Sequence, residues 1–277
     1  MGGLAQWVVL GIGLWIVQTV VCANSDLKCK VDVPGSTLQP CKVLSDCSVN
    51  HDLCKSTVLI AVKNADDSFT VKAMGVAVSP KHFLTSVLSD FKKYGDEELY
   101  IIYKGKNVVP LRNQQLYPRF ILARPDVKAW ADFVLVELSE KSSLSFDPVP
   151  IASVGAKLPT APLTFVSDKQ DTLSLNVQFT FLPDADCATL FRHDVMKIDP
   201  KYTVCASDKN SKFTKFLTGA PVVAKVFRQR GYVLYGLRSV TPVGVPDSKD
   251  YLVTRLGQHC DWFESVTNGV IKCKLTN

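Results

Sequence analysis

The sequence lacks several patterns that define common protein classes. Its 277 residues contain no N-x-S/T site, so N-glycosylation is not expected. No two cysteines have the C-x2-C spacing of zinc sites and the four histidines are scattered, so we expect no metal site and no cofactor. Glycine and proline number only 15 each, without repeats or low-complexity tracts. Collagen-like, coiled-coil and disordered chains are thereby excluded.

The excess of positively charged over negatively charged residues is also small. The net charge is +6, with a sequence pI near 8.8. This balance favours polyanions or acidic partners, but it is far too small to indicate a nucleic-acid-binding protein, and we expect no nucleic acid as partner. Apolar residues make up 47% of the chain, which is enough to form a sizeable core.

The first 23 residues are predicted to be a signal peptide. No charged residue occurs from Leu4 to Val21, residues 7–17 have the length of an apolar signal core, and cleavage is expected after Ala23. The mature protein is then secreted to the extracellular space and has no membrane span. The alternative is an uncleaved membrane anchor, because the uncharged stretch is just long enough to cross a bilayer and no Lys or Arg precedes it.

Cysteine usage agrees with export. Nine cysteines become eight once Cys22 leaves with the signal peptide, and an even number in an exported chain predicts disulfide bonds. Four of the eight lie within residues 29–54, which hold few large apolar side chains. We therefore expect residues 24–55 to be an N-terminal segment that depends on disulfides or on the main body for its stability.

Residues 56–277 are predicted to form one all-β domain. Short apolar, β-branched runs alternate with turn signals, and 12-residue helical patterns do not intervene. The expected strands are 57–62, 74–78, 98–103, 132–138, 163–166, 177–182, 221–226 and 232–237. The one expected helix covers residues 258–266.

Four segments, in order along the chain, carry a resemblance to a known family. They are GVAVSPKHFLTS at 75–86, DFVLVEL at 132–138, TGAPVV at 218–223 with the preceding Cys187 and Cys205, and YLVTRL at 251–256 continuing through DWF at 261–263. Together they resemble the chymotrypsin/trypsin family of serine proteases over residues 56–277. The resemblance implies two packed six-stranded antiparallel β-barrels with a C-terminal helix, a site in the cleft between them, and a Cys187–Cys205 disulfide. The pairing of the other six cysteines stays open: Cys29, Cys41, Cys47, Cys54, Cys260 and Cys273.

Aligned on these motifs, the catalytic triad is degenerate. Leu88 stands where the family has its histidine, and leucine cannot accept a proton. Asp132 matches the catalytic aspartate, but it has no imidazole to orient. Thr218 replaces the nucleophilic serine, and its extra methyl group crowds the attack. His82 lies six residues before Leu88 and is interpreted as a turn residue, not as a substitute base.

The positions around the triad have changed as well. Phe216 replaces a glycine of the oxyanion hole, and Leu217 replaces the aspartate that receives the new amino terminus on zymogen activation. Tyr251 stands where a glycine usually keeps the specificity pocket open, so its ring is expected to fill that pocket. Ser239 matches the serine that commonly contacts the family's aspartate.

A basic stretch follows this region. Between Asp208 and Arg230 six cations stand against one acid, a net charge of +5. They are Lys209, Lys212, Lys215, Lys225, Arg228 and Arg230. Such a cluster could recognise a sulfated glycan or another anionic surface, although ordinary solvated charges would look the same in sequence.

The sequence therefore predicts a secreted, catalytically inactive serine protease homologue that binds an extracellular protein, as cofactor or decoy in a proteolytic or immune cascade. One alternative is a polyanion-binding or antimicrobial module on the same fold. Another is a residual serine-type endopeptidase that uses an atypical site.

Overall fold

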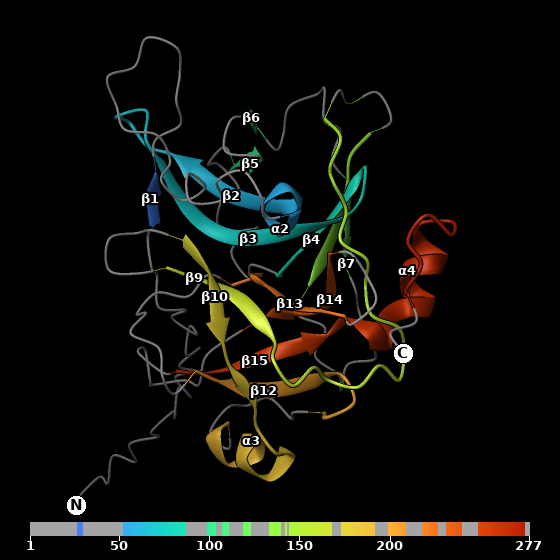
Figure 1. Ribbon diagram of the computed structural model, residues 1–277. Coiled ribbons are helices and arrows are strands. Elements are labelled where there is room, and N and C mark those ends of the chain that lie inside the picture. The colour runs from blue at the N-terminus through green and yellow to red at the C-terminus, as the bar shows by residue number, and fades with distance from the viewer. Residues whose placement is uncertain are drawn as a thin grey trace, which may run out of the picture.

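A computed structural model describes most of the body of the chain (Figure 1). The described residues are 27–29, 52–86, 99–103, 107–110, 119–122, 133–139, 142, 144–167, 173–191, 199–208, 218–226, 231–239 and 249–274. The predicted signal peptide and most of the predicted N-terminal segment lie outside these ranges. Within that segment, β1 (Leu27–Cys29) pairs with β3, with Leu27 opposite Val71, so these three residues belong to a sheet of the body.

The first sheet is antiparallel and contains eight strands, in the order β6-β5-β2-β3-β4-β8-β7 with β1 added to β3. After β1, its strands are β2 (Thr57–Lys63), β3 (Phe69–Ser79), β4 (His82–Thr85), β5 (Leu99–Tyr103), β6 (Asn107–Pro110), β7 (Arg119–Leu122) and β8 (Val134–Glu137). The long strand β3 curves across the upper half of the molecule, and the sheet curls into a half-barrel (Figure 1).

The second sheet is also antiparallel and contains seven strands, in the order β10-β9-β13-β14-β15-β12-β11. They are β9 (Leu163–Ser167), β10 (Leu173–Gln178), β11 (Thr180–Phe181), β12 (Thr203–Ser207), β13 (Pro221–Lys225), β14 (Tyr232–Arg238) and β15 (Asp250–Arg255). Among the described residues the strands form two antiparallel sheets, and the finer expectation of two closed six-stranded barrels stays a prediction. The mostly β architecture itself is confirmed.

Short helices complete the described structure: α2 (Asp52–Ser56), α3 (Asp184–Leu190), the 3-10 helix η1 (Leu256–His259) and α4 (Cys260–Val266). The predicted C-terminal helix is therefore present. The sequence prediction missed α2 and α3. Asp184 and Asp186 lie in the first turn of α3, where negative charge stabilises a helix through its dipole. This pair of acidic residues was a sequence signal for a helix start that the prediction did not use. None of the described helices is long and apolar enough to cross a membrane.

The core follows from the two-residue period of the strands. In β2, Leu59 and Ala61 face a cluster that also contains Val223 and Leu234 of the second sheet, whereas the alternate residues Val58 and Ile60 face a cluster inside the first sheet. Both faces of β2 are therefore covered, which explains its continuous apolar run. The first of these clusters joins the two sheets into one core.

A tight turn fastens the two sheets to each other. The amide of Met74 in β3 donates to the carbonyl of Thr218 at 2.9 Å, and the next amide, of Gly219, donates to the carbonyl of Arg238 at 2.7 Å. Gly219 has φ +79°, and a Cβ built there would lie 2.1 Å from the Met74 carbonyl oxygen. Only glycine allows this approach.

We expect Gly219→Ala to lower the free energy of unfolding by about 3 kcal/mol or more, because the methyl group would collide with backbone. Gly155→Ala is the matched control: Gly155 has the same φ of +79°, but a Cβ there meets nothing within 4 Å. That control should cost only the left-handed strain, roughly 1–2 kcal/mol. Urea unfolding of both variants measures the difference, and equal losses would contradict the close-approach explanation.

Candidate functional site

The candidate site lies where the turn at Thr218 meets the ends of β14 and β15. Thr218 is half-buried in the turn that joins the sheets. The other positions aligned with the family's catalytic machinery, Leu88, Asp132, Phe216 and Leu217, lie outside the described residues. Their predicted roles stay predictions.

The end of β14 places Ser239 and Arg238 beside β15. The Ser239 amide donates to the carbonyl of Leu252 at 2.8 Å, and Arg238 stands opposite Val253 in the strand pairing. Tyr251 comes from β15 itself. The structure therefore brings together Ser239 and Tyr251, two of the residues selected from the sequence, and adds Arg238 between them.

Arg238 and Tyr251 form a buried stacked pair. The guanidinium carbon lies 3.8 Å from the centre of the tyrosine ring, and the two residues are 1% and 0% exposed. Such cation–π contacts gain strength when desolvated. Phe179 packs edge-on against the same tyrosine, with ring centres 5.6 Å apart. Two large side chains thus fill the interior at this point.

Burial governs the protonation of this pair. Loss of hydration lowers the pKa of Arg238 to about 9, a shift that the nearby Tyr251 and Asp208 partly oppose. Burial also raises the pKa of Tyr251 well above its usual value. At neutral pH the arginine therefore stays cationic and the phenol stays neutral, so neither group is poised to move a proton in a reaction.

Arg238 and Asp208 were not among the site residues predicted from the sequence. Arg238 is the charged last residue of the otherwise uncharged strand β14, next to Ser239. A single charge at the end of such an uncharged run was the sequence signal that could have drawn attention to it. Asp208 was counted only as the single acid of the basic stretch. The structure buries it to 2% exposure at the end of β12, where its charge acts on the arginine.

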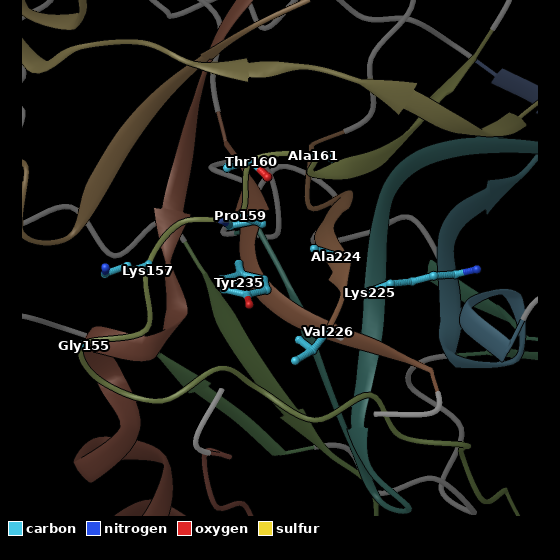
Figure 2. A pocket seen from close by; sticks show the side chains of 9 residues that line it. All are labelled: Gly155, Lys157, Pro159, Thr160, Ala161, Ala224, Lys225, Val226 and Tyr235. Atoms are coloured by element: carbon cyan, nitrogen blue, oxygen red, sulfur yellow. The ribbon is translucent and has the colours of Figure 1, made fainter. Parts of the chain in front are cut away.

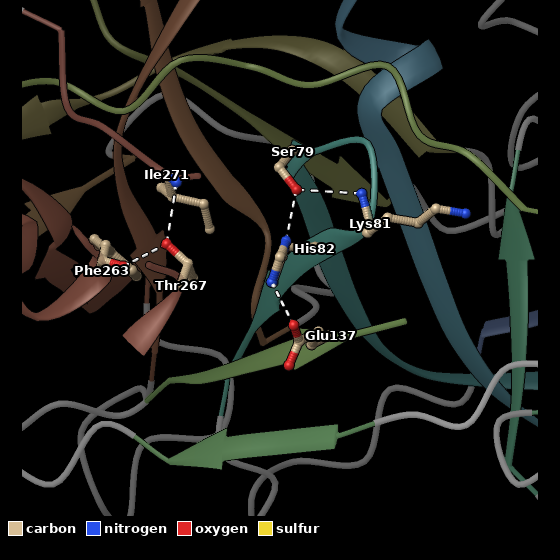
Figure 3. Close-up of polar contacts among 7 residues, drawn as sticks. All are labelled: Ser79, Lys81, His82, Glu137, Phe263, Thr267 and Ile271. Atoms are coloured by element: carbon tan, nitrogen blue, oxygen red, sulfur yellow. Dashed lines mark hydrogen bonds and ion pairs between the residues drawn. The ribbon is translucent and has the colours of Figure 1, made fainter. Parts of the chain in front are cut away.

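A serine, a histidine and a glutamate meet elsewhere, in the first sheet (Figure 3). Ser79 Oγ lies 2.6 Å from His82 Nδ1, and His82 Nε2 lies 3.5 Å from Glu137 Oε1. The sequence placed His82 in a turn. In the structure the turn consists of Pro80 and Lys81, and His82 is the first residue of strand β4. Ser79 is 3% exposed, and its oxygen also accepts the Lys81 amide at 3.2 Å. A nucleophile so enclosed is badly placed to reach a substrate.

A second histidine, His259, sits in an aromatic cluster under helix α4. Its ring lies 5.0 Å from Phe133 and 5.3 Å from Tyr202, measured between ring centres. Burial, with a smaller contribution from the charge of Lys201, lowers the pKa of His259 to about 4. Within the described ranges, no three His, Cys, Asp or Glu side chains group as ligands for a metal ion.

Two disulfides brace the second half of the chain. Cys187–Cys205 ties α3 to β12, with Cα atoms 5.4 Å apart, which is the pairing that the resemblance implied. Cys260–Cys273 ties the start of α4 to the segment after it, with Cα atoms 5.7 Å apart. The second bond settles one pairing that the sequence left open.

Of the six cations in the predicted basic cluster, the structure describes Lys225. Its side chain is exposed, with the ammonium 5.6 Å from the centre of the Tyr232 ring. Lys209, Lys212, Lys215, Arg228 and Arg230 lie outside the described residues, so a common basic surface stays a prediction.

Comparison with known proteins supports the fold. No family model matches the sequence, and no curated protein is significantly similar to it. A solved structure titled "Structure of GrC", of granzyme C, a trypsin-like serine protease, matches with a TM-score of 0.53. The match covers 79% of this chain and 97% of that chain at 14% sequence identity. At this identity the likeness concerns the fold alone, and the architecture is consistent with a trypsin-like fold.

We expect Tyr251→Ala to lower the free energy of unfolding by about 3–5 kcal/mol, because it leaves a cavity beside a buried guanidinium. Tyr251→Phe keeps the ring over Arg238 and fills the same space, so it should cost about 1 kcal/mol or less. Denaturant unfolding of both variants checks this. A Tyr251→Ala protein as stable as Tyr251→Phe would show that the stacking contributes little.

Stability should also fall at acid pH because of His259. Its folded pKa of about 4 lies below the unfolded value of 6.5, so the fold favours the neutral ring. The contribution is complete above pH 6.5 and is lost progressively as the pH falls toward 4.

His259→Gln removes this titration. We expect the stability difference between wild type and variant to shrink as the pH falls through this window, measured by urea unfolding at several pH values. A difference independent of pH would contradict the assignment.

Proposed function

We propose that this chain is a secreted, non-catalytic homologue of trypsin-like serine proteases that acts by binding another extracellular protein. Its role would be that of a cofactor or decoy in an extracellular proteolytic or immune cascade. The trypsin-like architecture supplies a rigid β scaffold, and loops on such a scaffold are common binding surfaces.

The observation that carries the proposal is the buried Arg238–Tyr251 pair. By the family resemblance, Tyr251 occupies the wall of the primary specificity pocket. A substrate side chain entering there would have to displace a fully buried ring and a guanidinium 3.8 Å from it. Threonine at 218 and leucine at 88 in the aligned triad positions point the same way, because neither the usual nucleophile nor its base is present.

Secretion is supported by the disulfides. Cys187–Cys205 and Cys260–Cys273 both need an oxidising compartment to form and persist. A trypsin-like fold with a predicted signal peptide fits the same route.

A fluorophosphonate probe, which labels activated serines, tests the absence of catalysis. We expect the purified chain of residues 24–277 to stay unlabelled beside active trypsin as positive control. The double variant Leu88→His, Thr218→Ser should also fail to cleave peptides, because Arg238 and Tyr251 still fill the pocket.

Two controls locate any labelling that does occur. Labelling abolished by Thr218→Ala would show a working family site and would overturn the proposal. Labelling abolished by Ser79→Ala would instead favour an endopeptidase that uses the Ser79–His82–Glu137 group. Labelling that survives both substitutions would place the reactive group at neither of these sites.

The binding role is tested by capture of a partner from the protein's own extracellular fluid at low and high salt. A defined protein retained at high salt supports the proposal. Retention that vanishes with salt, and with Lys209, Lys212 and Lys215 changed to Ala, would favour polyanion binding, because exposed charges are screened within about 10 Å at ~0.1 M salt.

A further inference from the structure

An open groove lies where strands β9 and β13 separate. The two strands pair at Val223 and Leu163, and continuing that antiparallel register would place Lys225 opposite Ala161 and Val226 opposite Thr160. No such pairs form among the described residues; these four residues instead line a cavity of about 560 Å³. Pro162 lies between Ala161 and Leu163, and proline cannot donate to a strand ladder, which explains why the pairing stops.

The middle of the groove is largely apolar. Tyr235 projects from β14 between the two walls, flanked by Pro159 on one side and by Ala224 and Val226 on the other (Figure 2). Tyr235 is only half-buried, so its ring is available to a ligand. Aromatic rings with one polar end are frequent anchors of protein interfaces.

Both ends of the groove are cationic. Lys157 and Lys225 lie on opposite sides of Tyr235, and their side chains extend away from each other (Figure 2). The nine residues that line the groove include these two lysines and no acidic residue. Because these side chains extend in opposite directions from Tyr235, an extended chain that passes over the ring is better suited to reach both lysines than a compact anion is (Figure 2).

We propose that this groove binds an extended, acidic polypeptide segment of the partner, with an apolar side chain over Tyr235 and carboxylates at Lys157 and Lys225. This proposal rests on the proposed protein-binding function and names the surface and the chemistry of the partner. The segment that leads into β9 and the end of β13 line the two sides of the groove without pairing to each other, which leaves room for an extended backbone between them.

Fluorescence anisotropy tests the groove with a labelled peptide of alternating Glu and Val, about eight residues long at roughly 3.3 Å per residue. We expect the double variant Lys157→Gln, Lys225→Gln to bind it about tenfold more weakly, and Tyr235→Ser to weaken binding several-fold. Lys63→Gln is the matched control, because Lys63 is an exposed lysine of the first sheet, ion-paired to Asp67 at 2.7 Å. It should bind as the wild type does.

An all-Glu peptide of the same length and a heparin oligosaccharide test whether binding depends on charge alone or also on the apolar side chains of the Glu–Val peptide. Both should bind more weakly than the Glu–Val peptide and should be insensitive to Tyr235→Ser. The groove proposal is overturned if either binds as tightly as the Glu–Val peptide with the same response to the variants, which would indicate general polyanion attraction. It is also overturned if the lysine substitutions leave peptide binding unchanged or if no peptide binds.

The two proposals fail in distinguishable ways. If the double lysine variant still captures the natural partner at high salt while no acidic peptide binds, the groove is wrong and the protein-binding function stands. If the fluorophosphonate probe labels Thr218, the non-catalytic function is wrong, whereas the peptide measurements still report on the groove.

Discussion

The close contact between Gly219 and Met74 is the constraint on which the arrangement of the two sheets depends. Four backbone groups meet there: the Met74 amide donates to the Thr218 carbonyl, and the Gly219 amide donates to the Arg238 carbonyl. The side chain of Thr85 donates to the Met74 carbonyl at 2.7 Å and completes the joint. A side chain at 219 would force the sheets apart. Because Thr218 and Arg238 are both held at this joint, the same contact fixes the geometry of the candidate site.

At the candidate site, Arg238 and Tyr251 are packed against each other and buried. A protease pocket must stay open and hydrated until a substrate arrives, whereas here a cation and an aromatic ring are packed against each other without exposure. A buried arginine is costly unless its charge is compensated. The stacked ring of Tyr251 and the carboxylate of Asp208 supply that compensation, and both hold the arginine in its charged form. The cluster thus contributes to a rigid second sheet.

A sheet in which two neighbouring strands separate offers a place for binding. Pro162 stops the pairing of β9 with β13. The space left between the two chain segments is lined by polar and apolar side chains, and the charged residues among the described ones that line it are both lysines. The strands on either side keep their pairing, so the proposed binding groove needs no change in the core.

The sequence by itself predicted eight strand segments and the terminal helix, each of which overlaps an observed element, since alternating apolar residues are local signals. It did not predict several other strands, among them β4, β6 and β12. The Cys187–Cys205 pairing was implied by the family resemblance. It also pointed to Tyr251. It did not reveal that Arg238 stacks on that ring, that His82 joins Ser79 and Glu137, or that Lys157 and Lys225 flank one groove. Each of these depends on residues that lie on different strands or loops of the chain, such as His82 and Glu137 or Lys157 and Lys225. Only the tertiary structure, through strand register and the packing of one sheet on the other, decides which of them meet.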